Sequence, residues 1–215
     1  MKKNEINSKR ILILSPHTDD GELGAGASIA KWLEEGNEIY WMAFSIARQS
    51  VPEGFPEDVL YHEFTSVVHM LGVKNYEILD FPVRRFHENR QDILEKLVEI
   101  RNHFRPELVV GPSLNDVHQD HGVIANEMVR AFKGTASVMA YELPWNQLTF
   151  NPQLFVDVNQ SHAERKWQML KNYKTQLHLR RNYFSKQYIF SHLTFRGVQV
   201  GMPLAEAFEI IRWRL

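Results

Sequence analysis

Short apolar runs alternate along the chain with longer segments in which apolar residues recur at helical spacing. A short apolar run bounded by polar residues is typical of a buried strand, and its alternation with helices indicates a sheet wound with crossover helices. The pattern predicts strands at Ile11–Ser15, Ile39–Phe44, Tyr76–Leu79, Leu108–Val110, Ser137–Ala140 and Leu154–Val158. We therefore expect an α/β fold around a mostly parallel sheet.

The segments between these strands show helical periodicity, and several of them stop at glycine or before proline. The first two predicted helices are Leu23–Glu35, ending at Gly36, and Glu57–Leu71, ending at Gly72. The third has Ile93, Leu97, Ile100 and Phe104 on one face and ends before Pro106, and the fourth begins near Val123. A capping box from Ser161 to Glu164 opens the fifth, and the sixth follows Arg180 and runs to about Arg196 with Gly197 as its stop. A last apolar run spans Phe208 to Ile211.

The length of the chain indicates the number of domains, and its net charge bears on which partners it binds. At 215 residues the chain suits one well-packed domain, so we treat residues 1–215 as a single domain. The net charge of -1 gives no global attraction to nucleic acid or to an anionic membrane, and the basic stretch RRNYFSK is too short to indicate nucleic-acid binding. A homo-oligomer is left open, because the aromatic-rich segment Tyr141–Phe155 suits either a pocket rim or an interface.

The chain contains no cysteine, which excludes disulfides and thiolate metal sites and fits a reducing compartment. A metal site must then use His, Asp or Glu. The basic start of the chain is followed by an apolar segment of only Ile11–Leu14, too short for a signal-peptide core or a membrane span. These features predict a cytoplasmic protein with no membrane span.

Two clusters of His and Asp follow predicted strands. SPHTDDG comes after the first strand, and PSLNDVHQDHG comes after the strand at Leu108–Val110. In an open parallel sheet, loops at the carboxyl ends of the strands form the ligand site, so neighbouring strands would bring the two clusters together. Asp19 and Asp20 are adjacent carboxylates that repel each other, and a bound cation would offset that repulsion.

The residue types suit a catalytic zinc site, which uses three protein ligands and keeps a fourth position for water. His17 and Asp20 are three residues apart, and His118 and His121 repeat that spacing. We expect His17, Asp20 and His121 to bind one Zn²⁺ per chain, although such a donor set also accommodates other divalent metals.

The remaining polar residues can supply acid and base chemistry. Asp19 would accept a proton from the attacking water, as a general base does. His118, held as an imidazolium by Asp116 or Asp120, would stabilise the oxyanion of a tetrahedral intermediate. We therefore count Asp19, His118 and Asp120 as catalytic candidates for hydrolysis of an amide or ester.

The stretch PHTDDGELGAGASIAKWLEEG, followed later by HQDHG, resembles the PIG-L/LmbE-like de-N-acetylase family, whose members carry P-H-x-D-D and H-x-D-H motifs after two strands. The resemblance extends to RPELVVGPSLNDVHQDH, to FVDV before KWQMLKNYKTQ, and to the terminal AEAF. It implies a Rossmann-like three-layer sandwich with helices on both faces of the sheet. It also implies zinc-dependent removal of acetyl groups from N-acetylated amino sugars or their conjugates.

The resemblance assigns the metal to His17, Asp20 and His121, the base to Asp19, and transition-state assistance to His118. The chain departs from many members at Thr18, where they have Pro, and at Gly21, where they have Glu. It also has Leu60 where many sugar deacetylases carry Arg. These departures leave the metal and base positions intact but predict different substrate contacts.

Substrate contacts are expected from loops at the same edge of the sheet. The candidates are Arg48, Arg84, Asp116, Trp145 and Asn146. Arginine suits a phosphate or carboxylate, and an aromatic ring suits the face of a sugar. The expected partner is a small N-acylated molecule.

Other functions need separate consideration. GELGAG is not a dinucleotide loop, because Ile29 stands where its third glycine or alanine belongs; Gly24 and Gly26 more simply allow close packing of helix on strand.

Two alternatives to deacetylation are cleavage of another acyl amide, such as a formyl amide, and a non-catalytic protein that binds metal or ligand on the same fold.

Overall fold

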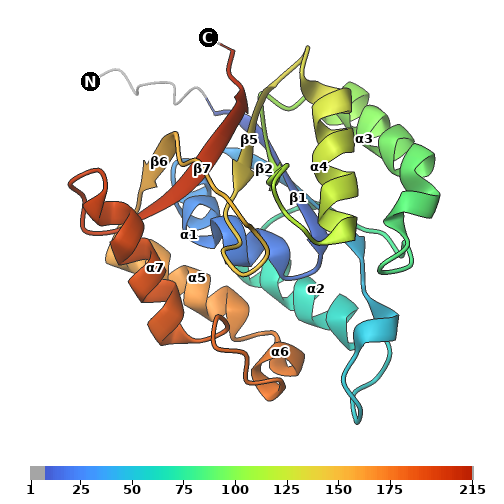
Figure 1. Cartoon of the computed structure of the whole chain (residues 1–215), viewed down its shortest axis with the longest axis horizontal. Helices are drawn as coiled ribbons and strands as arrows, with labels where there is room; N and C mark the ends of the chain where they lie inside the picture. Colours follow the sequence, from blue (N-terminus) through green and yellow to red (C-terminus); the bar gives the residue numbers. More distant parts are fainter. Residues whose placement is uncertain (1–7, 215) are drawn as a thin grey trace.

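The computed structural model describes residues 8–214 and contains one sheet of seven strands in the order β3-β2-β1-β4-β5-β7-β6 (Figure 1). The strands are β1 (Arg10–His17), β2 (Glu38–Ser45), β3 (Asn75–Ile78), β4 (Leu108–Pro112), β5 (Ser137–Tyr141), β6 (Leu154–Asp157) and β7 (Ala205–Arg212). The helices are α1 (Asp20–Glu34), α2 (Val59–Leu71), α3 (Arg90–Phe104), α4 (Gln119–Phe132), α5 (Gln160–Leu170), α6 (Lys174–His178) and α7 (Lys186–Val198), with short 3₁₀ turns at Arg48–Ser50 and Phe86–Asn89.

The sheet is mostly parallel, as the sequence predicts. Strands β1 to β5 run parallel to one another, whereas β7 is antiparallel to both of its neighbours, β5 and β6. Each of the predicted strands is present, and the last apolar run forms the central part of β7. No helix within residues 8–214 is both long enough and apolar enough to cross a membrane.

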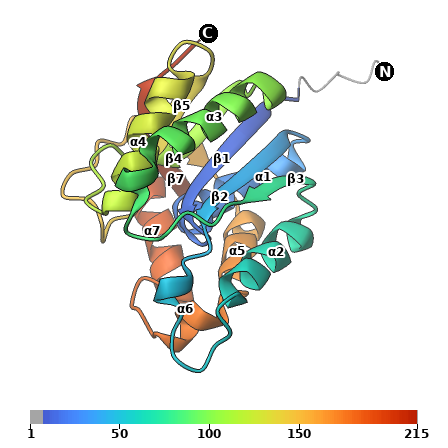
Figure 2. The same ribbon diagram turned by 90° about the vertical axis from the view of Figure 1, so that its right-hand side faces the viewer.

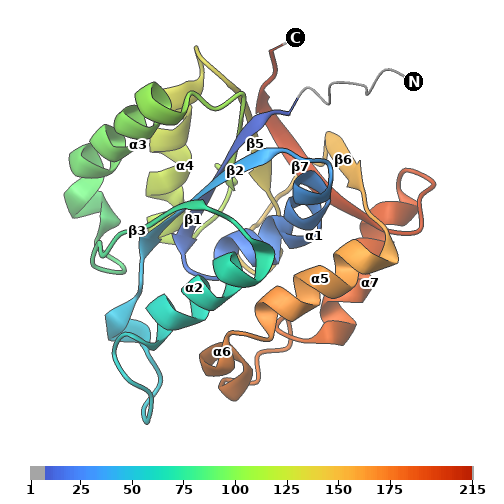
Figure 3. The same ribbon diagram turned by 180° about the vertical axis from the view of Figure 1, so that it is seen from behind.

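Helices cover both faces of the sheet, which gives the expected three layers (Figures 2 and 3). Successive side chains of a strand point to opposite faces. Accordingly, Ile11 and Ile13 of β1 pack with residues of α1, α2, α5 and α7, whereas Leu12 and Leu14 pack with residues of α3 and α4. The alternating pleat of β1 therefore divides the core into two clusters.

The start of α5 differs from the sequence-based expectation. The helix begins at Gln160, and its capping box joins Asn159 and His162 instead of Ser161 and Glu164. The amide of His162 donates to Oδ1 of Asn159 (3.0 Å), and the amide of Asn159 donates to Nδ1 of His162 (3.2 Å). The side chain of Asn159 thus satisfies an N-terminal amide that Ser161, already inside the helix, cannot reach.

Two other helix boundaries also differ. α4 begins at Gln119, before the expected start near Val123, because His118 acts as its N-cap. α7 begins only at Lys186, later than expected, and continues through its predicted stop at Gly197. A Cβ at Gly197 would lie 2.5 Å from the carbonyl oxygen of Met202, so this glycine serves close packing inside the helix.

Helix α1 packs closely against the sheet, and this packing fixes the position of its N-terminal end. A Cβ at Gly24 would lie 2.4 Å from the ring of Tyr141, and the Tyr141 hydroxyl donates to the carbonyl of Leu14 in β1 (3.0 Å). The buried Lys166 donates to the carbonyl of Leu23 (2.7 Å) and pairs with Glu206 (2.6 Å). The predicted close packing of helix on strand is therefore confirmed at Gly24, whereas a Cβ at Gly26 would meet the side chain of Lys166 in helix α5.

Buried polar contacts also anchor the N-terminal turn of α1. The Tyr173 hydroxyl lies 2.6 Å from both the carbonyl oxygen of Thr18 and Oε1 of Glu22. Burial raises the pKa of Glu22 well above its usual range, so this carboxyl is held in its neutral form. The turn that carries Asp19 and Asp20 is thus tied to the segment after α5.

We predict that Gly24→Ala destabilises the protein, because the added methyl would overlap the Tyr141 ring. Overpacking of this kind costs about 1–3 kcal/mol of unfolding free energy. Gly122→Ala is the matched control: Gly122 also lies in a helix, and its Cβ would meet no atom within 4 Å. Urea unfolding should show a loss for Gly24→Ala and a neutral or stabilising effect for Gly122→Ala; equal behaviour of the two variants would contradict this account.

Candidate metal centre

The two clusters of His and Asp lie together at the carboxyl ends of β1 and β4, which are neighbouring parallel strands. His17 is the last residue of β1, and Asp20 opens α1. His121 lies in the first turn of α4, after the loop that follows β4. The expected convergence of two segments about a hundred residues apart is present, because β4 pairs directly with β1.

Three side-chain atoms converge on one point. Oδ2 of Asp20 lies 3.2 Å from Nδ1 of His17 and 3.3 Å from Nε2 of His121, and the two ring nitrogens are 3.3 Å apart. Tetrahedral zinc with bonds of about 2.0–2.1 Å separates its ligand atoms by about 3.4 Å. This nearly equilateral triangle of two nitrogens and one oxygen therefore fits a divalent cation.

Local structure fixes the Asp20 carboxylate. Its Oδ2 accepts the backbone amide of His17 at 2.8 Å, so the first turn of α1 folds back onto the end of β1. His118 is also near: ring nitrogens of His17, His118 and His121 lie within 4.8 Å of one another. A third imidazole therefore lies beside the three predicted ligands.

Each of the two imidazoles at the triangle contacts a carboxylate with its other nitrogen. Nε2 of His17 lies 3.1 Å from Oδ2 of Asp120, and Nδ1 of His121 lies 2.7 Å from Oδ2 of Asp116. A carboxylate in this position fixes the ring orientation and the tautomer of a metal-binding histidine. Both rings are thus oriented with one nitrogen toward the shared point, where a metal ion would take the place of a proton.

The charges at the triangle favour a cation. Burial lowers the pKa of His121. The negative charge of Asp20 and the hydrogen bonds to Asp116 and Asp20 outweigh this effect and raise the pKa to about 10. Burial also opposes ionisation of Asp20, yet the charge of His121 and hydrogen bonds to His121 and His17 hold the pKa of this carboxyl well below its usual range. The cluster therefore stabilises positive charge among its carboxylates.

The carboxylates of Asp116 and Asp120 pair with His121 and His17 and not with the ring of His118, which corrects the expected pairing. Nδ1 of His118 instead accepts the amide of Asp120 (3.3 Å) as the N-cap of α4. Burial, with the charges of His121 and His17, lowers the pKa of His118 to about 4. In this geometry His118 is a neutral imidazole with its proton on Nε2, not the expected imidazolium.

Asp19 lies next to the triangle at the N-cap position of α1, and its side chain makes no capping hydrogen bond. It lines the pocket that opens over His17, Asp20 and His121. Burial and the adjacent charge of Asp20 raise the pKa of Asp19 to about 6. A carboxylate with a pKa close to neutrality suits proton transfer.

The pocket over these residues has a volume of about 210 Å³, below the range of about 300–1,000 Å³ typical of drug-sized ligands. Trp145 and Asn146 line it, as predicted. One face of the Trp145 indole, however, is covered by the ring of Tyr183, with 3.9 Å between ring centres and 7° between ring planes. That face cannot serve as a platform for a sugar.

Three predicted substrate residues lie outside the lining of the pocket. The Arg48 guanidinium is partly exposed and pairs with Asp80 at 2.9 Å. Arg84 contributes its backbone amide, which donates to Asp120 at 2.6 Å from a left-handed backbone conformation with φ of 68°. Asp116 is buried against His121. Their contacts place Arg84 and Asp116 behind His17 and His121 instead of on the rim.

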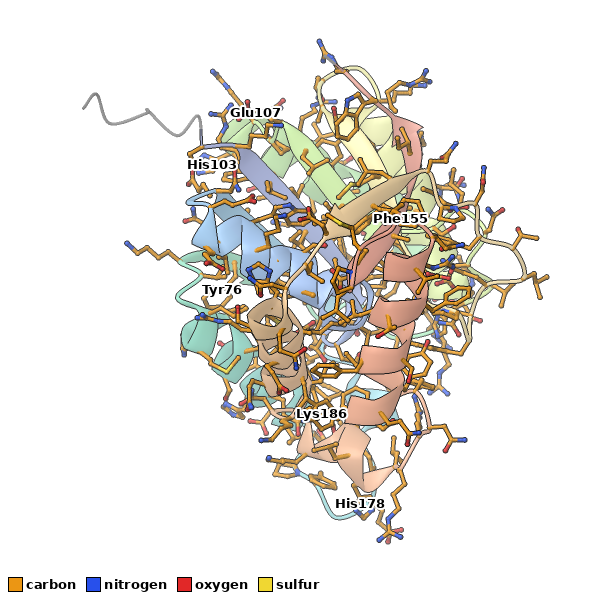
Figure 4. All side chains as sticks on the ribbon, turned by 90° about the vertical axis from the view of Figure 1, so that its left-hand side faces the viewer. Tyr76, His103, Glu107, Phe155, His178 and Lys186 are labelled. Atoms are coloured by element: carbon orange, nitrogen blue, oxygen red, sulfur yellow. The ribbon has the colours of Figure 1, made fainter. Side chains whose placement is uncertain are left out.

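Sequence reasoning missed lining residues that come from the segment between α5 and α7. Gln176, Arg181 and Tyr183 all line the pocket. The signal available in the sequence was the basic and aromatic stretch RRNYFSK, but its place near the first strand depends on packing of the last helices. Figure 4 shows this end of the molecule, with His178 and Lys186 far from His103 and Glu107, which precede β4.

Part of the chain matches a known protein family. Residues 12–132 match the PIG-L family, described as GlcNAc-PI de-N-acetylase. The chain belongs to the PIG-L family. The match includes both strands that carry the His and Asp clusters, so the resemblance read from the motifs is confirmed.

Relatives cover most of the chain. The Escherichia coli protein described as uncharacterized deacetylase YaiS is 27% identical over 172 residues, which are 78% of this chain and 91% of YaiS. The N,N'-diacetylchitobiose deacetylase from Pyrococcus horikoshii has the same fold, with a TM-score of 0.80 and 17% identity over 95% of this chain and 84% of that chain. GalB, the 4-carboxy-2-hydroxymuconate hydratase from Pseudomonas putida, has a TM-score of 0.75 and 21% identity over 96% and 98% of the two chains.

We predict that Asp116→Asn lowers the affinity for zinc by about 10–100-fold. The amide nitrogen of asparagine would face Nδ1 of His121, favouring a proton on Nε2, the atom that points to the triangle. Asp157→Asn, at an exposed carboxylate that pairs with Lys31, is the control. Competition titration with a chelator measures both affinities, and an Asp116→Asn protein that binds zinc as tightly as the control would show that this carboxylate does not orient His121.

Proposed function

We propose that this protein is a zinc-dependent hydrolase that removes an acetyl group from an N-acetylated amino sugar or sugar conjugate. One observation carries the proposal: two imidazoles and one carboxylate meet at 3.2–3.3 Å, each imidazole is backed by a second carboxylate, and Asp19 stands beside them. Membership of the PIG-L family and the deacetylases among its relatives support the acetyl amide as the reacting group.

His17, Asp20 and His121 would hold the metal. When bound, zinc supplies a Lewis acid that polarises the acetyl carbonyl and makes water more acidic. The carboxylates of Asp116 and Asp120 would accept hydrogen bonds from the ring nitrogens that face away from the metal, so that the other nitrogen of each ring is the one that would bind it.

Asp19 would act as the base and then as the acid. Its carboxylate accepts a proton from the attacking water and returns it to the amine nitrogen as the amide bond breaks. The neutral His118 can donate a hydrogen bond from Nε2 to the oxygen of the tetrahedral intermediate, a stabilisation that does not require an imidazolium. This division of roles uses each polar residue at the floor of the pocket.

Two other functions remain distinguishable from deacetylation. Cleavage of a formyl amide would release formate instead of acetate from a panel of acylated amines. A non-catalytic protein would bind zinc without turnover of any substrate in the panel. The hydratase among the proteins of the same fold shows that the fold by itself does not determine the reaction, so the released acid is the decisive product.

Replacement of Asp19 tests its role as the base. Asp19→Asn should reduce the rate of acetate release by about 10²–10⁴-fold, because the amide cannot accept the proton. Zinc content should stay at about one ion per chain, since the three ligands are unchanged. Asp157→Asn should release acetate at the rate of the parent; undiminished acetate release by Asp19→Asn would remove Asp19 from the mechanism.

Metal removal tests the proposal as a whole. Dialysis against a chelator should abolish acetate release, and addition of zinc should restore it, with about one zinc per chain by elemental analysis. Acetate release that persists in protein shown to be free of metal would contradict the proposed function.

A further inference from the structure

Arg181 is a cation in the pocket that has no acidic partner. It lies between α6 and α7, lines the same pocket as Asp19 and His121, and is exposed to solvent. Its guanidinium donates to the hydroxyl of Tyr183 at 2.5 Å and lies 5.8 Å from the centre of that ring. Among the ion pairs formed by residues 8–214, none involves Arg181. The guanidinium therefore keeps donors that a ligand can use.

The side of the pocket that carries Arg181 is pre-formed by contacts within the protein. Tyr183 stacks on Trp145, and Tyr188 of α7 meets the same indole edge-on at 6.1 Å between ring centres. The loop that holds Trp145 is fixed to α7, because Glu142 pairs with Arg196 and with His192 (2.9 Å). A guanidinium placed by such a stack loses little freedom on binding, which favours affinity.

A second feature of this wall points to a ligand. Oε1 of Gln176 is a buried acceptor that has no hydrogen-bond partner within the described residues, and Gln176 lines the pocket together with Arg181. A buried acceptor without a partner is costly unless something supplies a donor. A hydroxyl group of a sugar would satisfy it.

The charges of the residues that line the pocket bear on which ligand it favours. Asp19 and Asp20 are the carboxylates that line it, and a dication at the proposed metal site would neutralise both. The charge of Arg181 would then be uncompensated. Leu23, Leu60 and Val83, which also line the pocket, are apolar. An anionic group of a ligand could pair with Arg181 inside the pocket, because the other two carboxylates of the site, Asp116 and Asp120, lie behind the histidines and do not line it.

The position of Arg181 indicates which part of a substrate it would meet. Asp19 and Arg181 line the same pocket, so one ligand in it can contact both side chains. In the proposed reaction Asp19 returns a proton to the amine nitrogen. We accordingly assign Arg181 to the amine part of the substrate, the part that Asp19 would protonate.

We propose that Arg181 is a specificity residue that binds an anionic group, a carboxylate or a phosphate, on the amino-sugar part of the substrate. The inference rests on the proposed function. Arginine matches the geometry of both oxyanions through paired N–H donors. The substrate class is thus a small N-acetylated amino sugar acid or amino sugar phosphate, with its sugar ring in the pocket of about 210 Å³.

Binding of the deacetylated products tests this without turnover. Isothermal titration of the zinc-loaded protein compares glucosamine with glucosamine 6-phosphate and with muramic acid, which add a phosphate and a carboxylate respectively. At least one of the two anions should bind about tenfold or more tightly than glucosamine, the gain expected for hydrogen bonds to a charged group. Which anion gains shows whether Arg181 reads a phosphate or a carboxylate.

Variants assign the preference to one side chain. Arg181→Gln should remove the preference, Arg181→Lys should retain part of it, and Arg180→Gln should leave it intact, because Arg180 is the adjacent arginine and does not line the pocket. Urea unfolding confirms that each variant is folded. Equal binding of glucosamine and both anions, or a preference that survives in Arg181→Gln, would overturn the inference.

The outcomes separate this inference from the proposed function. Preferential binding of the anion without acetate release from any acetylated amine would refute the deacetylase and leave Arg181 as an anion-binding residue. Acetate release with no preference that depends on Arg181 would leave the deacetylase and refute the specificity.

Discussion

Three carboxylates surround two imidazoles at the carboxyl ends of β1 and β4, and this concentration of ionisable groups favours positive charge at its centre. Asp20 lies between the two rings, and Asp116 and Asp120 lie behind them. Such a cluster would be costly to bury without positive charge. The pairing of β1 with β4 brings the groups together, so the sheet order is the first requirement of the site.

The rest of the fold keeps the N-terminal turn of α1 in place at this point. The bare backbone at Gly24 lets α1 lie against Tyr141, and Lys166 and Glu206 bind the backbone of α1 within the core. Tyr173 ties the same turn to the segment after α5. A site whose ligands must agree within a few tenths of an ångström depends on this kind of rigid support.

Sequence patterns predicted the strands, most helices and the convergence of His17, Asp20 and His121, because these depend on local periodicity and on the rule that loops at one edge of a parallel sheet meet. The partners of the histidines were harder to predict. Asp116 and Asp120 lie within five residues of both His118 and His121, and only the geometry of the α4 N-terminus assigns them to His121 and His17. The capping of α5 by Asn159 similarly depended on a backbone conformation that the competing Ser161 motif concealed.

The rim could not be predicted, because its residues come from segments that only tertiary packing brings to the pocket. Arg48 and Arg84 follow the expected strands, yet one pairs with Asp80 and the other turns its backbone to Asp120. Arg181 reaches the pocket from the far end of the chain through the stack of Tyr183 on Trp145. The chemistry of the floor is thus local in sequence, whereas recognition at the rim is not.

The central claim is that His17, Asp20 and His121 bind one metal ion. Diffraction from crystals grown with zinc, recorded at the zinc absorption edge, tests it most directly. The account predicts one anomalous peak per chain at about 2.0–2.1 Å from Nδ1 of His17, Oδ2 of Asp20 and Nε2 of His121. A peak bound by the three histidines with Asp20 turned away, or no peak at the ends of β1 and β4, would contradict it.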